Sequence, residues 1–173
     1  MPRPPTARAV TSADADTDTD TDADADIDAV IAKRLRKANS SPCICTLGVQ
    51  GGPPSLEAAL ASIDELAHEL QPACLKVGIT CGPHYRFHHQ LEWPSYERLG
   101  YTHMRVLHAG TVAEAVYLER SLIAALRGRQ GVQNDRPGGE GSSTMTDPCF
   151  TYVVGVCAAD RGLMGPCKRR RCT

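Results

Sequence analysis

Two long segments of the chain place their apolar residues at helical spacing. Residues 55–71 follow an i, i+3, i+4 rhythm that gives one buried stripe: Leu56, Ala59, Leu60, Ile63, Leu66, Ala67 and Leu70. Ser55 is suited to cap this helix, and Pro72 ends it. A second stripe predicts a helix over Val112–Arg127: Val112, Ala115, Val116, Leu122, Ile123 and Leu126. Two amphipathic helices are therefore expected.

Short apolar runs between turn residues predict four strands: Cys43–Val49, Cys74–Thr80, Tyr101–Ala109 and Phe150–Val156. Pro83 suits the first turn of a short helix over His84–Leu91. Another short helix with a basic end is expected over Ile27–Lys37. Helices and strands alternate without a strict repeat, so we predict an α+β fold. Its sheet is expected to be small, mostly antiparallel and three- to four-stranded, with flanking helices.

One carboxylate interrupts the second stripe. Glu119 fills the i+7 position counted from Val112, near the centre of the predicted buried face. An unpaired carboxylate there would cost several kcal/mol or would have to take up a proton. Glu119 must therefore be compensated by a cation or open into a cleft, which makes it the first candidate for chemistry.

Charge divides the chain into a tail and a body. Eight of the 20 acidic residues are aspartates at every second position from Asp14 to Asp28, and residues 1–28 hold only two basic residues. The remainder carries 17 Lys or Arg against 12 Asp or Glu, which fits a polyanionic partner. We expect a disordered acidic N-terminal segment with a short basic helix at 1–41, a domain at 42–158 and a basic C-terminal tail at 159–173.

Composition also indicates in which cellular compartments the protein is expected. No apolar run reaches the roughly 18 residues of a membrane-spanning helix, and the N-terminus lacks the apolar core of a secretory signal. Eight cysteines without such a signal favour a reduced, intracellular protein. The basic run Lys168–Arg171 is compatible with nuclear import or with a solvated terminus.

Four residues follow one another in the order of a possible motif set: Gly78 within Lys76-Val77-Gly78-Ile79-Thr80, then Arg86, then Glu119 on a helix, then Asn134 before a Gly-Gly loop. Over about residues 43–140 the chain resembles the GIY-YIG nuclease superfamily, as a divergent member. The resemblance implies that the two motif strands pair and that a tyrosine lies on the first strand. Cys43–Gly48 contains no tyrosine, and residues 55–71 insert a helix between the motif strands.

The resemblance implies a metal-dependent endonuclease that cleaves nucleic-acid phosphodiesters, with DNA the favoured substrate. Arg86 would stabilise the phosphate, and Glu119 would bind Mg²⁺ or Mn²⁺. Gly78 and Asn134 would help to bind the substrate. A general base must replace the absent tyrosine, and the sequence leaves three candidates unranked: Lys76, Tyr85 and His89.

Other functions stay open on the sequence. The absent first-motif tyrosine allows a catalytically inactive module of the same fold, which binds nucleic acid or a protein partner. His84 and His88 are four residues apart on one predicted helix face, with Cys81 nearby, which is the spacing of a zinc site. A zinc protein is therefore a third class.

Overall fold

The computed structural model describes residues 26–46, 49, 52–71, 74–89, 94–134 and 145–157. The elements follow in the order α1 (Ile27–Asn39), β1 (Ile44–Cys45), α2 (Leu56–Leu70), β2 (Cys74–Thr80), α3 (Pro83–His88), β3 (His103–Gly110), α4 (Val112–Ala125) and β4 (Cys149–Val156). The predicted acidic segment before residue 26 and the predicted tail 159–173 lie outside the described residues.

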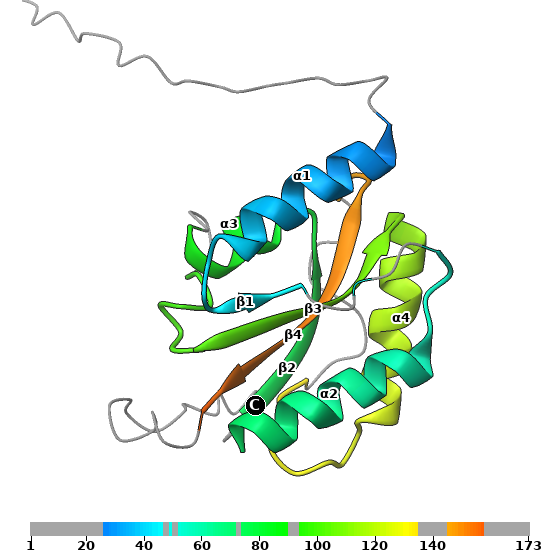
Figure 1. The fold of residues 1–173 in the computed structure, drawn as a ribbon. Helices are drawn as coiled ribbons and strands as arrows, with labels where there is room; N and C mark the ends of the chain where they lie inside the picture. The colour runs from blue at the N-terminus through cyan, green and yellow to red at the C-terminus, as the bar shows by residue number, and fades with distance from the viewer. Residues whose placement is uncertain are drawn as a thin grey trace, which may run out of the picture.

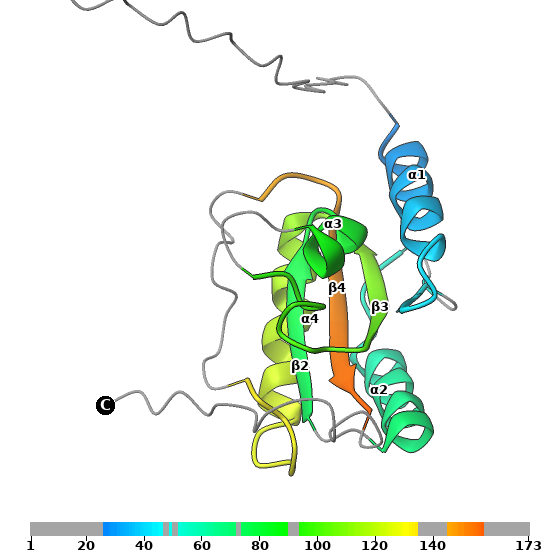
Figure 2. The ribbon, with the colours of Figure 1, turned by 90° about the vertical axis from the view of Figure 1, so that its left-hand side faces the viewer.

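The four strands form one sheet in the order β1-β3-β4-β2. β4 is antiparallel to both β2 and β3, whereas β1 runs parallel to β3. Figure 2 shows β2, β4 and β3 side by side, with α4 beside β2. The α+β class is confirmed. The prediction of a mostly antiparallel sheet is wrong because β1 joins β3 in parallel, which makes the sheet mixed.

The strand pairing also differs from the pairing of the two motif strands that the resemblance implies. β1 and β2 occupy opposite edges of the sheet, and the strand that pairs with β2 is β4. Of the predicted strand Cys43–Val49, only Ile44 and Cys45 pair with a neighbour. A short apolar run shows that a strand is favoured but not which strand it will join, so the sequence alone did not reveal this arrangement.

Two helices cover each face of the sheet. In Figure 1, α1 and α3 lie on one side, while α2 and α4 lie on the other. Alternate residues of β4 serve the two faces: Tyr152 and Val154 belong to the core under α1 and α3, and Val153 belongs to the core with α2 and α4. Every residue of β4 is buried, as expected of a central strand covered on both faces.

The two amphipathic helices agree with the sequence prediction, and their caps explain where they begin. The Ser55 hydroxyl accepts a hydrogen bond from the Ala58 amide at 3.2 Å. Thr111 and Glu114 form a capping box at the start of α4, in which each side chain bonds the other residue's backbone amide. Such caps satisfy amides that have no partner inside the helix.

α1, which the sequence analysis left in the N-terminal segment, packs on the folded body. Its Ala38 is fully buried in the core with Ile44 and Phe87. Arg34 Nη1 donates to the carbonyls of Cys81 at 2.6 Å and Pro148 at 3.0 Å, so one side chain joins the end of β2 to the start of β4. None of the helices in the described part of the chain has the length and apolarity to span a membrane.

Candidate functional site

The site begins at a glycine on an edge strand. Gly78 pairs with Tyr152 across β2 and β4, and the Tyr152 phenol lies over the glycine. A Cβ atom built at residue 78 would stand 2.5 Å from the Tyr152 hydroxyl oxygen and 2.8 Å from Cζ. Only glycine therefore allows the ring to occupy this place. The Tyr152 hydroxyl is also 2.8 Å from that of Tyr96, and both side chains are 2 % exposed.

Arg86, on α3, completes this group. Its guanidinium carbon lies 4.5 Å from the centroid of the Tyr96 ring, in cation–π geometry. The guanidinium also interacts with the phenol oxygens of Tyr96 and Tyr152. Its Nη1 is buried and has no hydrogen-bond partner among the described residues. A buried donor without a partner is energetically costly, so a hydrogen-bond acceptor that binds Arg86 Nη1 would be favoured.

Glu119 lies on the other face of the sheet. It is 3 % exposed, which confirms that the carboxylate belongs to the buried stripe of α4. In the preceding turn, Ala115 packs with Ile79, and its carbonyl accepts the Thr151 hydroxyl at 3.3 Å. In the following turn, Leu122 joins the core that contains Leu75 and Val77. Glu119 therefore stands at the level of Val77 and Gly78 along β2.

Glu119 belongs to the face of α4 that is turned towards the sheet. Glu114 Oε2 is 4.0 Å from His108 Nε2 of β3, so that side of the helix faces β3. Five residues later, Glu119 lies roughly 140° around the helix, within the buried stripe that it shares with Ala115, Leu118 and Leu122. Arg86 on α3 and Glu119 on α4 lie on opposite faces of the sheet (Figure 1), so the structure does not bring these two predicted site residues onto one surface.

Asn134 fixes a segment against the same edge. Its side-chain Oδ1 accepts from the Val77 amide, and its Nδ2 donates to the Val77 carbonyl, both at 2.8 Å. The preceding residues extend this pairing, since the Leu75 amide donates to the Gly131 carbonyl and the Gln133 amide donates to the Leu75 carbonyl. No described residue pairs with the outer edge of β2 beyond Val77. Among the described residues, the pairing along this edge therefore ends at Val77.

Asn134 should consequently matter for stability. Replacing it with alanine leaves the Val77 amide and carbonyl without partners, and we expect a loss of about 1–3 kcal/mol in the free energy of unfolding. The aspartate variant should recover only part of this, because a carboxylate accepts from the amide but cannot donate to the carbonyl. Urea unfolding of the two variants measures both losses. Equal stability of all three proteins would show that the pairing contributes nothing.

The three candidate bases are not equivalent. Lys76 is half-buried on β2 and, by strand alternation, points to the same face as Gly78. Tyr85 is 49 % exposed on α3, directly before Arg86. His89 is exposed at the C-terminal cap of α3, where its ring stacks on that of His84 with centroids 5.5 Å apart.

Neither buried tyrosine, Tyr96 or Tyr152, was predicted as a site residue from the sequence. Burial, the largest effect, and the neighbouring Tyr96 raise the pKa of Tyr152 well above its ordinary value, so Tyr152 is neutral at physiological pH. Its role at this site is therefore to position Arg86 and to cover Gly78. The strand that carries Tyr152 was predicted, but only the pairing with β2 reveals its neighbours.

Metal ligands are sparse. His84 and His88 have ring centroids 4.9 Å apart, but the Cys81 thiol bonds to the backbone of Thr146. No group of three or more His, Cys, Asp or Glu side chains within the described ranges is arranged to hold a metal ion. A closed zinc site therefore has no support there. Mg²⁺ has other needs, since it commonly takes one or two protein carboxylates and completes its shell with water and substrate phosphate.

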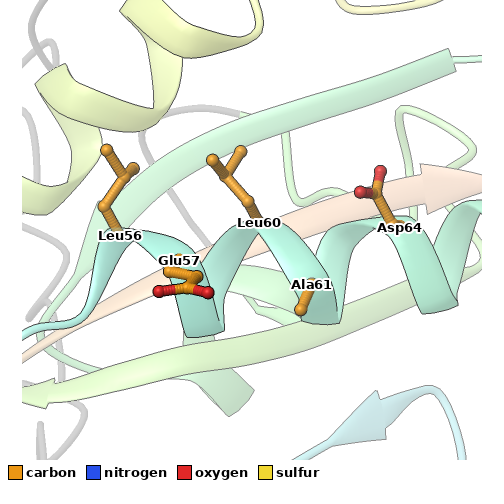
Figure 3. A pocket seen from close by; sticks show the side chains of 5 residues that line it. All are labelled: Leu56, Glu57, Leu60, Ala61 and Asp64. Atoms are coloured by element: carbon orange, nitrogen blue, oxygen red, sulfur yellow. The ribbon is translucent and has the colours of Figure 1, made fainter.

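A hollow elsewhere on the surface belongs to a single helix. It lies along the outside of α2 and is lined by Leu56, Glu57, Leu60, Ala61 and Asp64. Figure 3 shows that Leu56, Leu60 and Asp64 point to one side of the helix, while Glu57 and Ala61 point to the other. Because α2 and α3 cover opposite faces of the sheet, this hollow is separate from the Arg86 group.

We compared the chain with protein families, curated proteins and solved structures, and none of these three comparisons gives a match.

Proposed function

We propose that the protein is a GIY-YIG-like endonuclease that cleaves nucleic-acid phosphodiesters at the edge of β2. The observation that carries this proposal is the Arg86 guanidinium, held over the Tyr96 ring with a buried Nη1 that has no hydrogen-bond partner among the described residues. A guanidinium and a carboxylate are the two groups that phosphodiester cleavage most needs. The first holds phosphate oxygens, and the second holds a divalent cation.

Arg86 suits the stabilisation of a phosphate. Its guanidinium is held against the Tyr96 ring and leaves a buried donor without a partner in the described part of the chain. A phosphate oxygen would satisfy that donor with a charge-assisted hydrogen bond. Because packing fixes the guanidinium before the substrate arrives, little reorganisation is needed as negative charge develops in the transition state.

Glu119 is the candidate ligand for Mg²⁺ or Mn²⁺. One carboxylate fits a magnesium ion whose remaining ligands are water and substrate phosphate. When bound, the ion would neutralise charge on the phosphate and lower the pKa of a bound water. The need for substrate phosphate makes metal binding and nucleic-acid binding interdependent at this site.

β4 offers a substitute for the tyrosine that β1 lacks. In the resembled family, the first motif strand pairs with the second and carries a tyrosine. Here the strand that pairs with the Lys76–Thr80 strand is β4, and Tyr152 lies directly opposite Gly78. We infer that β4 takes the place of that strand. The neutral, buried phenol positions Arg86, and the base is one of the less buried groups Lys76, Tyr85 and His89.

A basic surface beside the site supports a nucleic-acid partner. α1 packs beside α3 and exposes Lys33, Arg36 and Lys37. Lys37 and the neighbouring histidines of α3 repel a proton on His84, although burial is the largest cause of the lowered pKa of that residue. Positive groups concentrated beside Arg86 would attract a phosphate backbone, and the attraction would weaken as salt rises.

Cleavage of a supercoiled plasmid tests the proposal. The full chain should nick the plasmid in the presence of Mg²⁺, and EDTA should stop the reaction. Glu119→Gln keeps the size of the side chain but removes its charge, so nicking should fall at least about a hundredfold. Ser121→Ala, on the same helix, should nick like the unchanged protein. Equal nicking by the Glu119→Gln variant would exclude a metal role for this carboxylate.

The burial of Tyr152 favours a second candidate, a catalytically inactive module that binds nucleic acid. A phenol that stays neutral cannot act as the base, and none of the three alternatives is fixed beside Gly78 by a described contact. This module would bind labelled single- or double-stranded oligonucleotides without cutting them. Fluorescence anisotropy at several salt concentrations identifies it, and binding that is absent or insensitive to salt would exclude it.

A further inference from the structure

Two cysteines meet at one end of the β2–β4 pair. The register of these strands ends with Thr80 opposite Phe150. Cys81 is the next residue after β2, and Cys149 is the first residue of β4, so continuation of the antiparallel register sets one beside the other. The two side chains are neighbours there, since Cys149 is the largest influence on the pKa of Cys81. Both are free thiols in the structure.

Backbone contacts hold each sulfur in this position. Cys81 Sγ donates to the Thr146 carbonyl at 3.2 Å and accepts from the Thr146 amide at 3.4 Å. Cys149 Sγ donates to the Thr80 carbonyl at 3.6 Å. Arg34 bonds the Cys81 and Pro148 carbonyls, which fixes the two chain segments relative to one another. The pair is therefore held together by five separate contacts rather than by chance proximity.

The two thiols differ in reactivity. The hydrogen bond from Cys149, which is the largest cause, together with the Thr146 backbone and Arg34, lowers the pKa of Cys81 to about 6 against the opposing effect of burial. The same bond and burial raise the pKa of Cys149. Cys81 is half-buried, whereas Cys149 is completely buried. One cysteine thus has the character of an attacking thiolate and the other that of a protected second thiol.

We propose that Cys81 and Cys149 form a redox modification site, in which a low-molecular-weight disulfide such as glutathione disulfide converts the two thiols into one intramolecular disulfide. The Cys81 thiolate attacks the disulfide, and one glutathione thiolate leaves. Cys149 then loses its proton to solvent and attacks the Cys81 sulfur of the mixed disulfide, so that the second glutathione thiolate leaves. The protein loses two electrons and two protons, and the oxidant becomes two glutathione molecules.

Peptide mapping after oxidation tests this site. The full chain, first reduced and then treated with glutathione disulfide, should lose two hydrogens, about 2 Da, and yield a tryptic peptide linking Cys81 to Cys149. The Cys149→Ser variant should instead retain a glutathione adduct on Cys81. As a matched control, Cys157→Ser should still form the linked peptide, because Cys157 lies at the other end of β4.

The reactivity of Cys81 gives a second measurement that does not depend on a variant. At pH 6.5, iodoacetamide should modify Cys81 in the reduced protein roughly fivefold faster than Cys157, because the lowered pKa of Cys81 supplies the reactive thiolate at that pH. The proposal is overturned if the oxidised protein keeps a glutathione adduct on Cys81 or links Cys81 to another cysteine. It is equally overturned if Cys81 reacts no faster than Cys157.

Discussion

Replacing Gly78 with alanine should lower the free energy of unfolding by about 1–3 kcal/mol, the usual cost of overpacking a well-filled core. Alanine normally suits a strand better than glycine does. Here its Cβ would stand 2.5 Å from the Tyr152 hydroxyl oxygen and 2.8 Å from Cζ, so the ring or the strand must move. Because the same ring orients Arg86, the movement should also reduce nucleic-acid cleavage. Urea unfolding and plasmid nicking measure the two effects.

A double-mutant cycle separates this clash from other effects of alanine. Tyr152→Leu removes the phenol that occupies the space above Gly78. The Gly78→Ala substitution should therefore cost at least about 1 kcal/mol less in the Tyr152→Leu protein than in the unchanged protein. If the substitution costs the same in both backgrounds, contact with Tyr152 is not the reason that residue 78 is a glycine.

Arg86→Ala should reduce single-turnover cleavage by about 10²–10³-fold, the typical loss on removing a donor that stabilises transition-state charge. Arg86→Lys should recover little of this activity, because an ammonium group lacks the planar fork that can stack on Tyr96 and bind phosphate oxygens together. Rates measured at saturating plasmid, with oligonucleotide affinity measured in parallel, distinguish a loss in the chemical step from a loss of binding.

The control for Arg86 is an exposed arginine of equal charge. Arg120 is exposed on the outer face of α4, and its replacement by alanine should leave the cleavage rate within about twofold, since a solvent-exposed charge contributes mainly through screened attraction. Equal losses in the Arg86→Ala and Arg120→Ala variants would show that cleavage depends on overall charge alone. The proposed role of Arg86 would then be wrong.

The helices and strands could be predicted from the sequence because capping residues and the spacing of apolar residues act within a few positions along the chain. Ser55 caps α2 as its position suggested, and the apolar stripe identified Glu119 as a buried carboxylate before its surroundings were known. The same reasoning could not predict the order of strands, since apolar runs do not specify their partners. The sequence therefore suggested β1 as the neighbour of β2, whereas β4 occupies that position.

Some residues of the candidate site were likewise predictable from the sequence, and others were not. Gly78 and Arg86 were identified from their order along the chain, and the structure brings them together through Tyr152. Tyr96 and Tyr152 were missed because their importance arises from a contact between residues 56 positions apart. Asn134 was expected to bind substrate, but its side chain is occupied by the backbone of Val77, which gives it a structural role.

The central claim is that Glu119 binds the divalent ion that nucleic-acid cleavage would require. Paramagnetic broadening by Mn²⁺, measured on the amide signals of the full chain with a short DNA duplex bound, tests it most directly. We predict the strongest broadening at Glu119 and its neighbours on α4, with broadening also at Val77 and Gly78, and its loss in the Glu119→Gln protein. Broadening centred on another part of the molecule, or unchanged in that variant, would contradict the claim.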